Sequence, residues 1–404
     1  MFNLRNVRKK KIARSTVPRG RERPVLTADL ADYVPALLAW FRENARDLPW
    51  RRTHDPYGIW VSEIMLQQTQ VKTVIPYWNR WMRQLPTAAS LAKAAPERVL
   101  KLWEGLGYYT RARNLQKAAQ IIKVQYGGKF PEDFEDVLAL PGIGRYTAGA
   151  ICSIAFNQPT PILDGNVIRV LTRLFGIASN PREKSTNARL WTLAGDLVSC
   201  AAKTSVADDW NCSKLNQALM ELGALVCSPS QPKCGVCPIA ARCVARRTCR
   251  VEAIPNLNRP VRVTARRFAA FIAENRGCFL VRQRPAGVVN AHLWEFPNAE
   301  LTANSLPLNQ VAELVLQTTP ASLQPLCVIK HTITRYRITL EAYRATINSR
   351  LPNTDRGRWL AWEELEALPF TSANRKLLGF CRPAITVIHP SARKSAISAG
   401  PMTK

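Results

Sequence analysis

The sequence lacks any long uninterrupted apolar run. No stretch of its 404 residues approaches the roughly 18 consecutive apolar residues of a membrane-spanning helix, so we expect a protein that does not enter a bilayer. No apolar signal-peptide stretch stands near the N-terminus. Acidic residues are scarce, because 29 Asp and Glu face 57 Lys and Arg, for a formal net charge of +28. This surplus indicates a polyanionic partner, either nucleic acid or an acidic membrane surface.

Composition and length favour a folded protein with more than one domain. Hydrophobic residues make up 47% of the chain, which is enough for packed cores and excludes a disordered, collagen-like or low-complexity protein. At roughly 100–200 residues per domain, the length favours two or three domains.

The residue pattern changes about two thirds of the way along the chain. Apolar residues first recur three and four positions apart, which predicts helices, including one stretch over residues 62–83. Short β-rich runs with helices between them follow. We therefore predict a mainly α N-terminal domain and a smaller α+β C-terminal domain. The predicted boundaries are 1–24 for a basic disordered arm (or a targeting segment), 25–245 for the helical domain, 246–266 for a basic interdomain linker, 267–382 for the α+β domain and 383–404 for a basic tail.

Four of the 11 cysteines lie close together with the spacing C-x6-C-x2-C-x5-C. This pattern suits one metal site in a reducing compartment better than a disulfide framework. Four thiolates need a soft metal, so zinc and an iron–sulfur cluster are the candidates. Only the central pair has the spacing of a zinc knuckle, and wrapping around a [4Fe-4S] cluster suits the longer gaps better. Unliganded structural cysteines are the alternative. The four are Cys227, Cys234, Cys237 and Cys243.

Two glycines stand one residue apart in Leu140-Pro-Gly-Ile-Gly-Arg-Tyr-Thr-Ala148. They follow one helical stretch and precede another, so residues 140–150 predict a helical hairpin whose backbone N–H groups point outward. Such a turn binds a phosphate without reading a base. A plain turn between two helices is the alternative.

Two carboxylates are candidates for catalysis. Asp164, in Leu163-Asp-Gly-Asn166, begins a helical stretch, where it is either an ordinary N-cap or an ionised group that faces a developing cation. Glu63 is predicted in the first turn of an apolar helix, on one face with Gln67 and Gln70. A carboxyl pressed against an apolar wall has a raised pKa and can act as a general acid, whereas capping is the ordinary role.

Together these motifs resemble one family. The set resembles the endonuclease III superfamily, the helix–hairpin–helix DNA glycosylases with an iron–sulfur loop, and within it the MutY family of adenine DNA glycosylases. The resemblance covers roughly residues 48–243 and also rests on Asp47-Leu-Pro-Trp-Arg51, Ser62-Glu-Ile-Met-Leu-Gln-Gln-Thr-Gln70 and Trp103-Glu-Gly-Leu-Gly-Tyr-Tyr109. Strand-cutting members carry a lysine just before the Thr-Ala of the hairpin. This chain has Tyr146 there, and tyrosine cannot form an imine with the sugar.

The resemblance implies a role for each candidate residue. MutY-like enzymes remove adenine mispaired with 8-oxoguanine or guanine, so Glu63 would protonate adenine N7 and Asp164 would stabilise the oxocarbenium-like sugar. Tyr146 and Asn166 would orient Asp164 and the sugar. The other implied DNA- or base-binding residues are Trp50, Arg51 and Gln217 for the adenine pocket, Gln68 and Tyr108 for filling the space left in the helix, and Gly142 and Gly144 of the hairpin.

The C-terminal region resembles the MutT-like (Nudix-type) domain that accompanies this family. The resemblance rests on Phe279-Leu-Val-Arg-Gln-Arg-Pro285 and Leu293-Trp-Glu-Phe-Pro297. The paired glutamates of the Nudix box, which hold magnesium, are missing after Pro297, so the domain is expected to bind rather than catalyse. In the family a Phe-Ser-His loop reads 8-oxoguanine. Ile333, Thr334 and Arg335 stand there instead, so aromatic stacking is lost although Thr334 keeps a hydroxyl.

Three other functions are open at this point. They are an endonuclease III-type pyrimidine glycosylase that also cuts the strand, a DNA-binding protein without activity, and a nucleotide pyrophosphohydrolase. The preferred interpretation is a monomeric, monofunctional adenine glycosylase that binds duplex DNA, carries a [4Fe-4S] cluster and makes no use of a membrane. Its expected location is the bacterial cytoplasm at the nucleoid, or the nucleus or an organelle if the host is eukaryotic.

Overall fold

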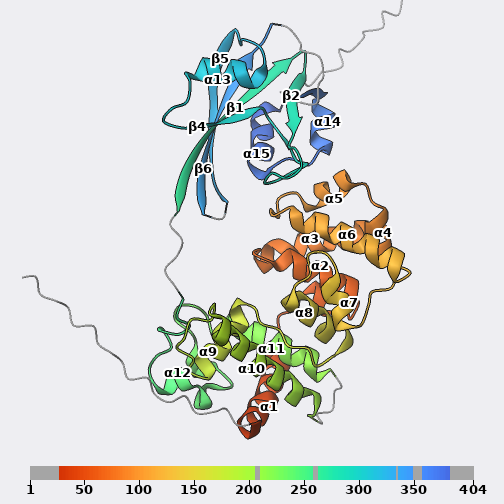
Figure 1. Cartoon of the computed structure of the whole chain (residues 1–404), viewed down its shortest axis with the longest axis vertical. Helices are drawn as coiled ribbons and strands as arrows, with labels where there is room; N and C mark the ends of the chain where they lie inside the picture. Colours follow the sequence, from red (N-terminus) through yellow and green to blue (C-terminus); the bar gives the residue numbers. More distant parts are fainter. Residues whose placement is uncertain (1–26, 205–209, 258–262, 334, 349–356, 383–404) are drawn as a thin grey trace, which may run out of the picture. The chain divides into compact units, whose positions relative to one another are not determined.

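The computed structural model describes residues 27–204, 210–257, 263–333, 335–348 and 357–382 (Figure 1). Within these ranges, no helix is both long and apolar enough to cross a membrane. The predicted basic arm and basic tail lie outside the described residues. The chain divides into two compact units, of which one joins the described residues up to Arg46 with Asn157–Leu257, and the other joins Asp47–Phe156 with the described residues that follow Asn258.

The first unit is helical. A bidentate ion pair ties the residues after its first helix to a later one, because Arg46 Nε and Nη2 donate to Glu221 Oε1 and Oε2, both at 2.7 Å. The Glu221 side chain is only 1% exposed, so it depends on this partner for compensation of its charge. The elements are α1 (Thr27–Asn44), α9 (Gly165–Leu174), α10 (Lys184–Ala202), α11 (Asn211–Leu225), the 3-10 turns η2 (Cys234–Val236) and η3 (Ala240–Arg242), and α12 (Val244–Arg247).

The helical part of the second unit packs around tryptophan. Trp60, Trp81 and Trp103 are completely buried in one apolar cluster, and the Trp81 and Trp103 rings meet edge to face at 5.6 Å. The elements are η1 (Pro49–Arg51), α2 (Pro56–Leu66), α3 (Val71–Gln84), α4 (Ala88–Lys93), α5 (Pro96–Trp103), α6 (Thr110–Gln125), α7 (Phe134–Ala139) and α8 (Arg145–Phe156).

One helix predicted from the sequence is two helices in the structure. The expected stretch over residues 62–83 breaks between α2 and α3, where Gln68 has a φ of 58°. α2 begins at Pro56, capped by the Asp55 side chain, which accepts hydrogen bonds from two backbone N–H groups. The prediction that Glu63 lies in a first turn is therefore wrong, as is the polar face shared with Gln67 and Gln70, since both glutamines lie beyond the end of α2.

Helices α7 and α8 form the predicted hairpin. α7 ends at Ala139, and α8 begins at Arg145 after the Pro141–Gly144 turn. Gly142 has a φ of 81°, and a Cβ there would lie 2.7 Å from the Asn114 Cβ. Only glycine fits this position without strain. The Gly144 carbonyl accepts the first helical hydrogen bond of α8, from the Ala148 N–H at 2.9 Å.

The C-terminal part of the second unit is an α+β domain built on a mixed seven-stranded sheet with the path β3-β2-β1-β6-β5. β1 and β6 pair parallel, whereas the other strand pairs are antiparallel. The fold class predicted from the sequence is therefore confirmed. The elements are β1 (Thr264–Asn275), β2 (Cys278–Gln283), β3 (Trp294–Glu295), β4 (Asn298–Leu301), α13 (Leu308–Leu316), β5 (Ser322–Ile333), β6 (Tyr336–Thr346), β7 (Arg358–Ala361), α14 (Trp362–Ala367) and α15 (Ser372–Cys381).

Both faces of this sheet are covered. Ala270 and Ile272 of β1 pack in one apolar cluster with residues of α14 and α15, whereas Ala269 and Phe271 pack in another cluster with residues of α13 (Figure 1). A strand covered on both sides reads as a continuous apolar run instead of an alternating one. This explains why residues 269–273 are all buried. β1 begins at Thr264, inside the stretch predicted as linker.

The two hairpin glycines allow a test of backbone strain, because only Gly142 has a positive φ and a close neighbour. We predict that Gly142→Ala lowers the free energy of unfolding by about 1–3 kcal/mol, because it adds positive-φ strain and a contact with Asn114. Gly144→Ala is the control, since open space surrounds that position. Urea unfolding of both variants measures the difference. Equal losses in the two variants would contradict the strain argument.

Candidate functional site

Glu63 is a buried carboxylate inside helix α2. It is 5% exposed, between Ser62 at 0% and Ile64 at 3%. The Tyr146 hydroxyl, from the second residue of α8, donates a hydrogen bond to Glu63 Oε2 at 2.8 Å. The position that carries a lysine in strand-cutting enzymes therefore holds a neutral donor that contacts the carboxylate directly. A buried carboxylate with a defined hydrogen-bond partner is the kind of group that acid–base catalysis uses.

Two of the three adenine-pocket candidates, Trp50 and Arg51, lie in η1. Trp50 is 6% exposed and meets the Trp78 ring edge to face at 6.2 Å. Arg51 is half-buried at the end of the turn. The indole thus has a packing role in the core, and the proposed contact of either residue with a base stays a prediction.

Asp164 caps helix α9 in the first unit. Its Oδ1 accepts from the Val167 N–H at 2.7 Å, and its Oδ2 accepts from Asn166 Nδ2 at 3.0 Å. Burial raises the pKa of Asp164 above its ordinary value, and these two hydrogen bonds act in the opposite direction. The capping and functional interpretations are compatible, because a cap on a rigid helix holds its carboxylate in one place.

Arg169 connects this cap to the cysteine segment. Its guanidinium donates to Asn166 Oδ1 at 2.8 Å, to the Gly223 carbonyl at 2.7 Å and to the Cys227 carbonyl at 2.6 Å. α9 and α11 approach closely there, since a Cβ on Gly223 would lie 2.6 Å from the Asn166 Cβ. Asp164 and Cys227 are therefore linked through two side chains. Sequence reasoning missed Arg169, although it lies only three residues after the quoted Asp164 motif.

The four clustered cysteines line one cavity, together with Arg173. Arg173 is buried and donates to Cys227 Sγ at 3.4 Å and to the Ser228 carbonyl at 2.7 Å. Burial raises the pKa of the Cys237 thiol to about 11, and its three neighbouring cysteines add to the shift. Within the described ranges, no group of three or more His, Cys, Asp or Glu residues meets the criteria for a metal-ion site. The predicted convergence of the cysteines is present, and their donor set suits a soft metal.

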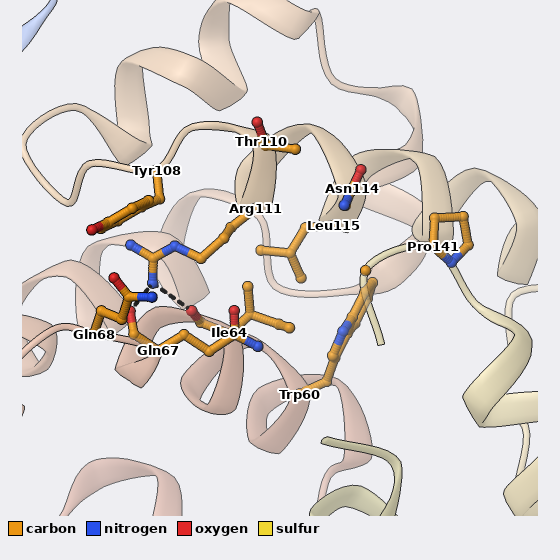
Figure 2. A pocket seen from close by; sticks show the side chains of 11 residues that line it. Trp60, Ile64, Gln67, Gln68, Tyr108, Thr110, Arg111, Asn114, Leu115 and Pro141 are labelled. Atoms are coloured by element: carbon orange, nitrogen blue, oxygen red, sulfur yellow. Dashed lines mark hydrogen bonds between the residues drawn. The ribbon is translucent and has the colours of Figure 1, made fainter. Parts of the chain in front are cut away.

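Gln68 and Tyr108 line a cavity of about 250 Å³ (Figure 2). Gln68 is exposed and Tyr108 is 43% exposed. Both side chains thus reach the surface from turns with positive φ, of 58° and 48°. An exposed polar side chain and an exposed ring beside each other suit insertion into a base stack.

Arg111 holds these two turns together. Its Nη1 donates to the Gln67 carbonyl at 2.6 Å and to the Ile64 carbonyl at 2.8 Å (Figure 2). Its Nη2 donates to the Gly107 carbonyl at 3.1 Å, and its guanidinium lies 5.6 Å from the Tyr108 ring centroid. Burial lowers the pKa of Arg111 to about 10. Sequence reasoning missed this residue, and its place two positions after the Tyr-Tyr pair was the available signal.

The remaining predicted residues are placed as follows. Gly142 and Gly144 are exposed in the hairpin turn. Gln217, half-buried on α11, donates from Nε2 to Ser213 Oγ at 3.1 Å. Ile333 pairs with Tyr336 at the end of the β5–β6 hairpin. Thr334 lies outside the described residues.

Two family descriptions match the chain. One, "HhH-GPD superfamily base excision DNA repair protein", matches residues 61–195, and the other, "NUDIX domain", matches residues 268–379. A solved structure of a thermostable thymine-DNA glycosylase aligns with 55% of this chain and 99% of its own, at 29% identity and a TM-score of 0.49. The matched families define a base excision repair glycosylase of the helix–hairpin–helix superfamily with a Nudix-like domain.

Curated relatives narrow the class. An adenine DNA glycosylase of Rattus norvegicus is 35% identical over 91% of this chain and 83% of its own length. The adenine DNA glycosylase of Homo sapiens is 34% identical over 87% of this chain and 74% of its own. The chain belongs to the adenine DNA glycosylase family, so it is a DNA-binding base excision repair enzyme.

The contacts of Arg169 predict that its substitution lowers the stability of the fold. We expect Arg169→Leu to lower the free energy of unfolding by about 2–4 kcal/mol, because it leaves two partly buried carbonyls, of Gly223 and Cys227, without this donor. Arg182→Leu is the control, since that side chain is exposed and should change stability by at most about 0.5 kcal/mol. Thermal melting compares the two. A loss for Arg169→Leu no larger than the control's would show that these bonds contribute little.

Proposed function

We propose that the protein is a monofunctional glycosylase that removes adenine opposite 8-oxoguanine or guanine and leaves an abasic site. The observation that carries the proposal is the buried Glu63 with the Tyr146 hydroxyl on its Oε2 at 2.8 Å. It supports Glu63 as a catalytic carboxyl whose neighbour, Tyr146, stands where strand-cutting members of the family carry a lysine. Family membership supports adenine as the base.

The reaction begins with extrusion of adenine from the stack, because neither N7 nor the anomeric carbon is accessible inside the duplex. The protonated Glu63 carboxyl then gives its proton to adenine N7. The bond between C1′ and N9 breaks with both electrons going to the base. Adenine leaves as a neutral molecule and C1′ becomes an oxocarbenium-like cation.

Asp164 stabilises that cation. Its carboxylate is held by the Val167 N–H and by Asn166 Nδ2, so it needs no reorganisation as positive charge develops on the sugar. Asn166 and Tyr146 act as positioning residues for the two carboxyl groups. A transient bond between Asp164 and C1′, as in retaining glycosidases, is compatible with this role.

Water completes hydrolysis. Its oxygen bonds to C1′ and its proton returns to Glu63, which is then ready for another cycle. The product keeps its phosphodiester backbone, since Tyr146 offers no amine for an imine with the sugar. This chemistry separates the proposal from an endonuclease III-type pyrimidine glycosylase.

The cysteine loop is proposed to hold a [4Fe-4S] cluster through Cys227, Cys234, Cys237 and Cys243. Their shared cavity supports one common ligand. The cluster would crosslink the loop and offset part of the negative charge of four thiolates. Arg173, which contacts both Cys227 Sγ and two carbonyls of the following residues, holds the segment in place beside it.

Duplex recognition is proposed to use three surfaces. The Gly142–Gly144 turn binds backbone phosphate, Gln68 and Tyr108 fill the gap left by the extruded adenine, and the Nudix-like domain reads the opposite base near Ile333. We further propose that the enzyme works as a monomer wherever the host keeps its DNA, in the nucleoid, the nucleus or an organelle. The basic stretch at 246–266 adds phosphate contacts whose strength falls with salt.

Two substitutions test the roles of the carboxyl groups. We expect Glu63→Gln to lower the single-turnover rate of adenine release about 10²–10⁴-fold with duplex binding nearly intact, since the amide has no proton to give. Asp164→Asn should cost about 10²–10³-fold, because a neutral amide does not balance the cation. The measurement is adenine release from a duplex with adenine opposite 8-oxoguanine.

Glu97→Gln is the matched control, because Glu97 is exposed on α5. Its rate should equal that of the wild-type enzyme. Near wild-type adenine release by Glu63→Gln would contradict its role as general acid. Near wild-type release by Asp164→Asn would contradict its role in stabilising the sugar cation. Binding lost in parallel with the rate would point instead to misfolding.

The cofactor has its own test. Purified protein should contain iron and acid-labile sulfide in equal amounts, and Cys237→Ser should lose most of both together with DNA affinity. Cys212→Ser is the control, since Cys212 is a buried cysteine of α11 outside the loop. Zinc in place of iron, or a wild-type iron content in Cys237→Ser, would contradict the assignment.

A further inference from the structure

The loop between α5 and α6 presents Tyr108 from a rigid frame. Tyr77 donates from its hydroxyl to the Glu104 carbonyl at 2.7 Å, and Trp103 Nε1 donates to the Gly107 carbonyl at 3.0 Å. A Cβ on Gly105 would lie 2.2 Å from the Tyr77 hydroxyl oxygen. These contacts fix the loop, so that Tyr108 can shift only if Glu104, the first residue of the loop, shifts with it.

The Glu104 side chain is held by groups from both parts of the second unit. Its carboxylate is 13% exposed and lies 3.2 Å from Lys101 Nζ, one turn back on α5. Arg375, on α15, donates from Nε to Oε1 at 2.9 Å and lies with Nη2 2.8 Å from Oε2. The Phe370 backbone N–H also donates to Oε1, at 2.7 Å. One carboxylate therefore joins two cations and one backbone donor.

The C-terminal side of this contact is anchored in its own core. Phe370 is completely buried and packs against Phe296. The Leu368 carbonyl accepts from both Lys101 Nζ, at 2.9 Å, and Arg375 Nη2, at 2.8 Å. A movement of Phe370 or Arg375 would therefore be transmitted to Glu104 and the Tyr108 loop.

Two further contacts join the same elements. The Tyr109 hydroxyl donates to the Phe370 carbonyl at 3.4 Å, and Arg113 Nη1 donates to the Ala291 carbonyl at 3.0 Å. Leu293, which directly precedes β3, is buried in the apolar cluster of the helices. Partly buried ion pairs of this kind add little net stability. They favour one geometry, because any arrangement that separates the partners leaves a charge without compensation.

We propose that the Glu104–Arg375 pair is a specificity-determining contact, through which the Nudix-like domain positions the Tyr108 loop according to the base opposite adenine. The inference rests on the proposed function, since it assumes that this domain reads the opposite base and that Tyr108 enters the duplex. Glu104 and Arg375 are positioning residues that touch neither the adenine nor the sugar. Their effect is on the preference among duplexes.

The test is a double-mutant cycle with Glu104→Gln, Arg375→Gln and the double variant in the full-length chain. Single-turnover rates are measured on duplexes with adenine opposite 8-oxoguanine and opposite guanine. We expect each single variant to lower the ratio of the two rates about tenfold, with no further loss in the double variant, because either change already breaks the pair. The ratio within one preparation does not depend on the fraction of active enzyme.

Glu341→Gln is the matched control. Glu341 pairs with Arg267 within the sheet, at 2.8 Å, and is remote in sequence from the loop, so this variant should keep the wild-type ratio. An unchanged ratio in Glu104→Gln and Arg375→Gln, equal losses on both duplexes, or additive losses in the double variant would each overturn the proposal. A wild-type enzyme that releases no adenine contradicts the proposed function, whereas a lesion-selective wild type with unchanged variants contradicts only the contact.

Discussion

The hydrogen bond from the Tyr146 hydroxyl to Glu63 connects helix α8 to helix α2 in the second unit, and these helices carry two of the proposed catalytic residues. Tyr146 is the second residue of α8, and α8 begins directly after the glycine turn proposed to bind phosphate. Glu63 lies on α2, which is buried along most of its length. The turn proposed to bind phosphate and the proposed general acid are therefore joined through one hydrogen bond between α8 and α2. A base that reaches Glu63 would meet a proton donor already in position, which is how preorganised sites lower a barrier without reorganisation.

The second carboxylate has a comparable frame in the first unit. Asp164 is held by the start of α9, and Arg169 joins α9 to α11 and to the cysteine segment. The cysteine loop thus supports the residue proposed to stabilise the sugar cation, although it takes no part in the bond changes. Each of the two proposed carboxyl groups is thus held by a rigid element of its own unit. The Nudix-like domain is proposed to add selection of the opposite base.

The sequence predicted the fold class, the cysteine convergence and the hairpin, because each depends on local spacing or on composition. Prediction from the sequence failed where contacts between residues far apart in the chain determine the local structure. The break after α2 depends on Gln68 in a positive-φ turn, which Arg111 from α6 stabilises. No local sequence pattern predicts the contact between Arg111 and this turn. The Arg169 and Glu104 networks were missed for the same reason, since most of their partners, such as Cys227 for Arg169 and Arg375 for Glu104, lie more than fifty residues away in sequence. Gly142 was a better guide, because it stands where a Cβ would collide with Asn114.

The most direct test of the account uses the wild-type enzyme on three duplexes, with adenine opposite 8-oxoguanine, adenine opposite guanine, and an oxidised pyrimidine. Single-turnover products are divided and read with and without alkali. The account predicts adenine release from the first duplex, with strand scission only after alkali, because Tyr146 cannot form an imine. Scission without alkali at the oxidised pyrimidine would contradict it and establish a strand-cutting glycosylase instead.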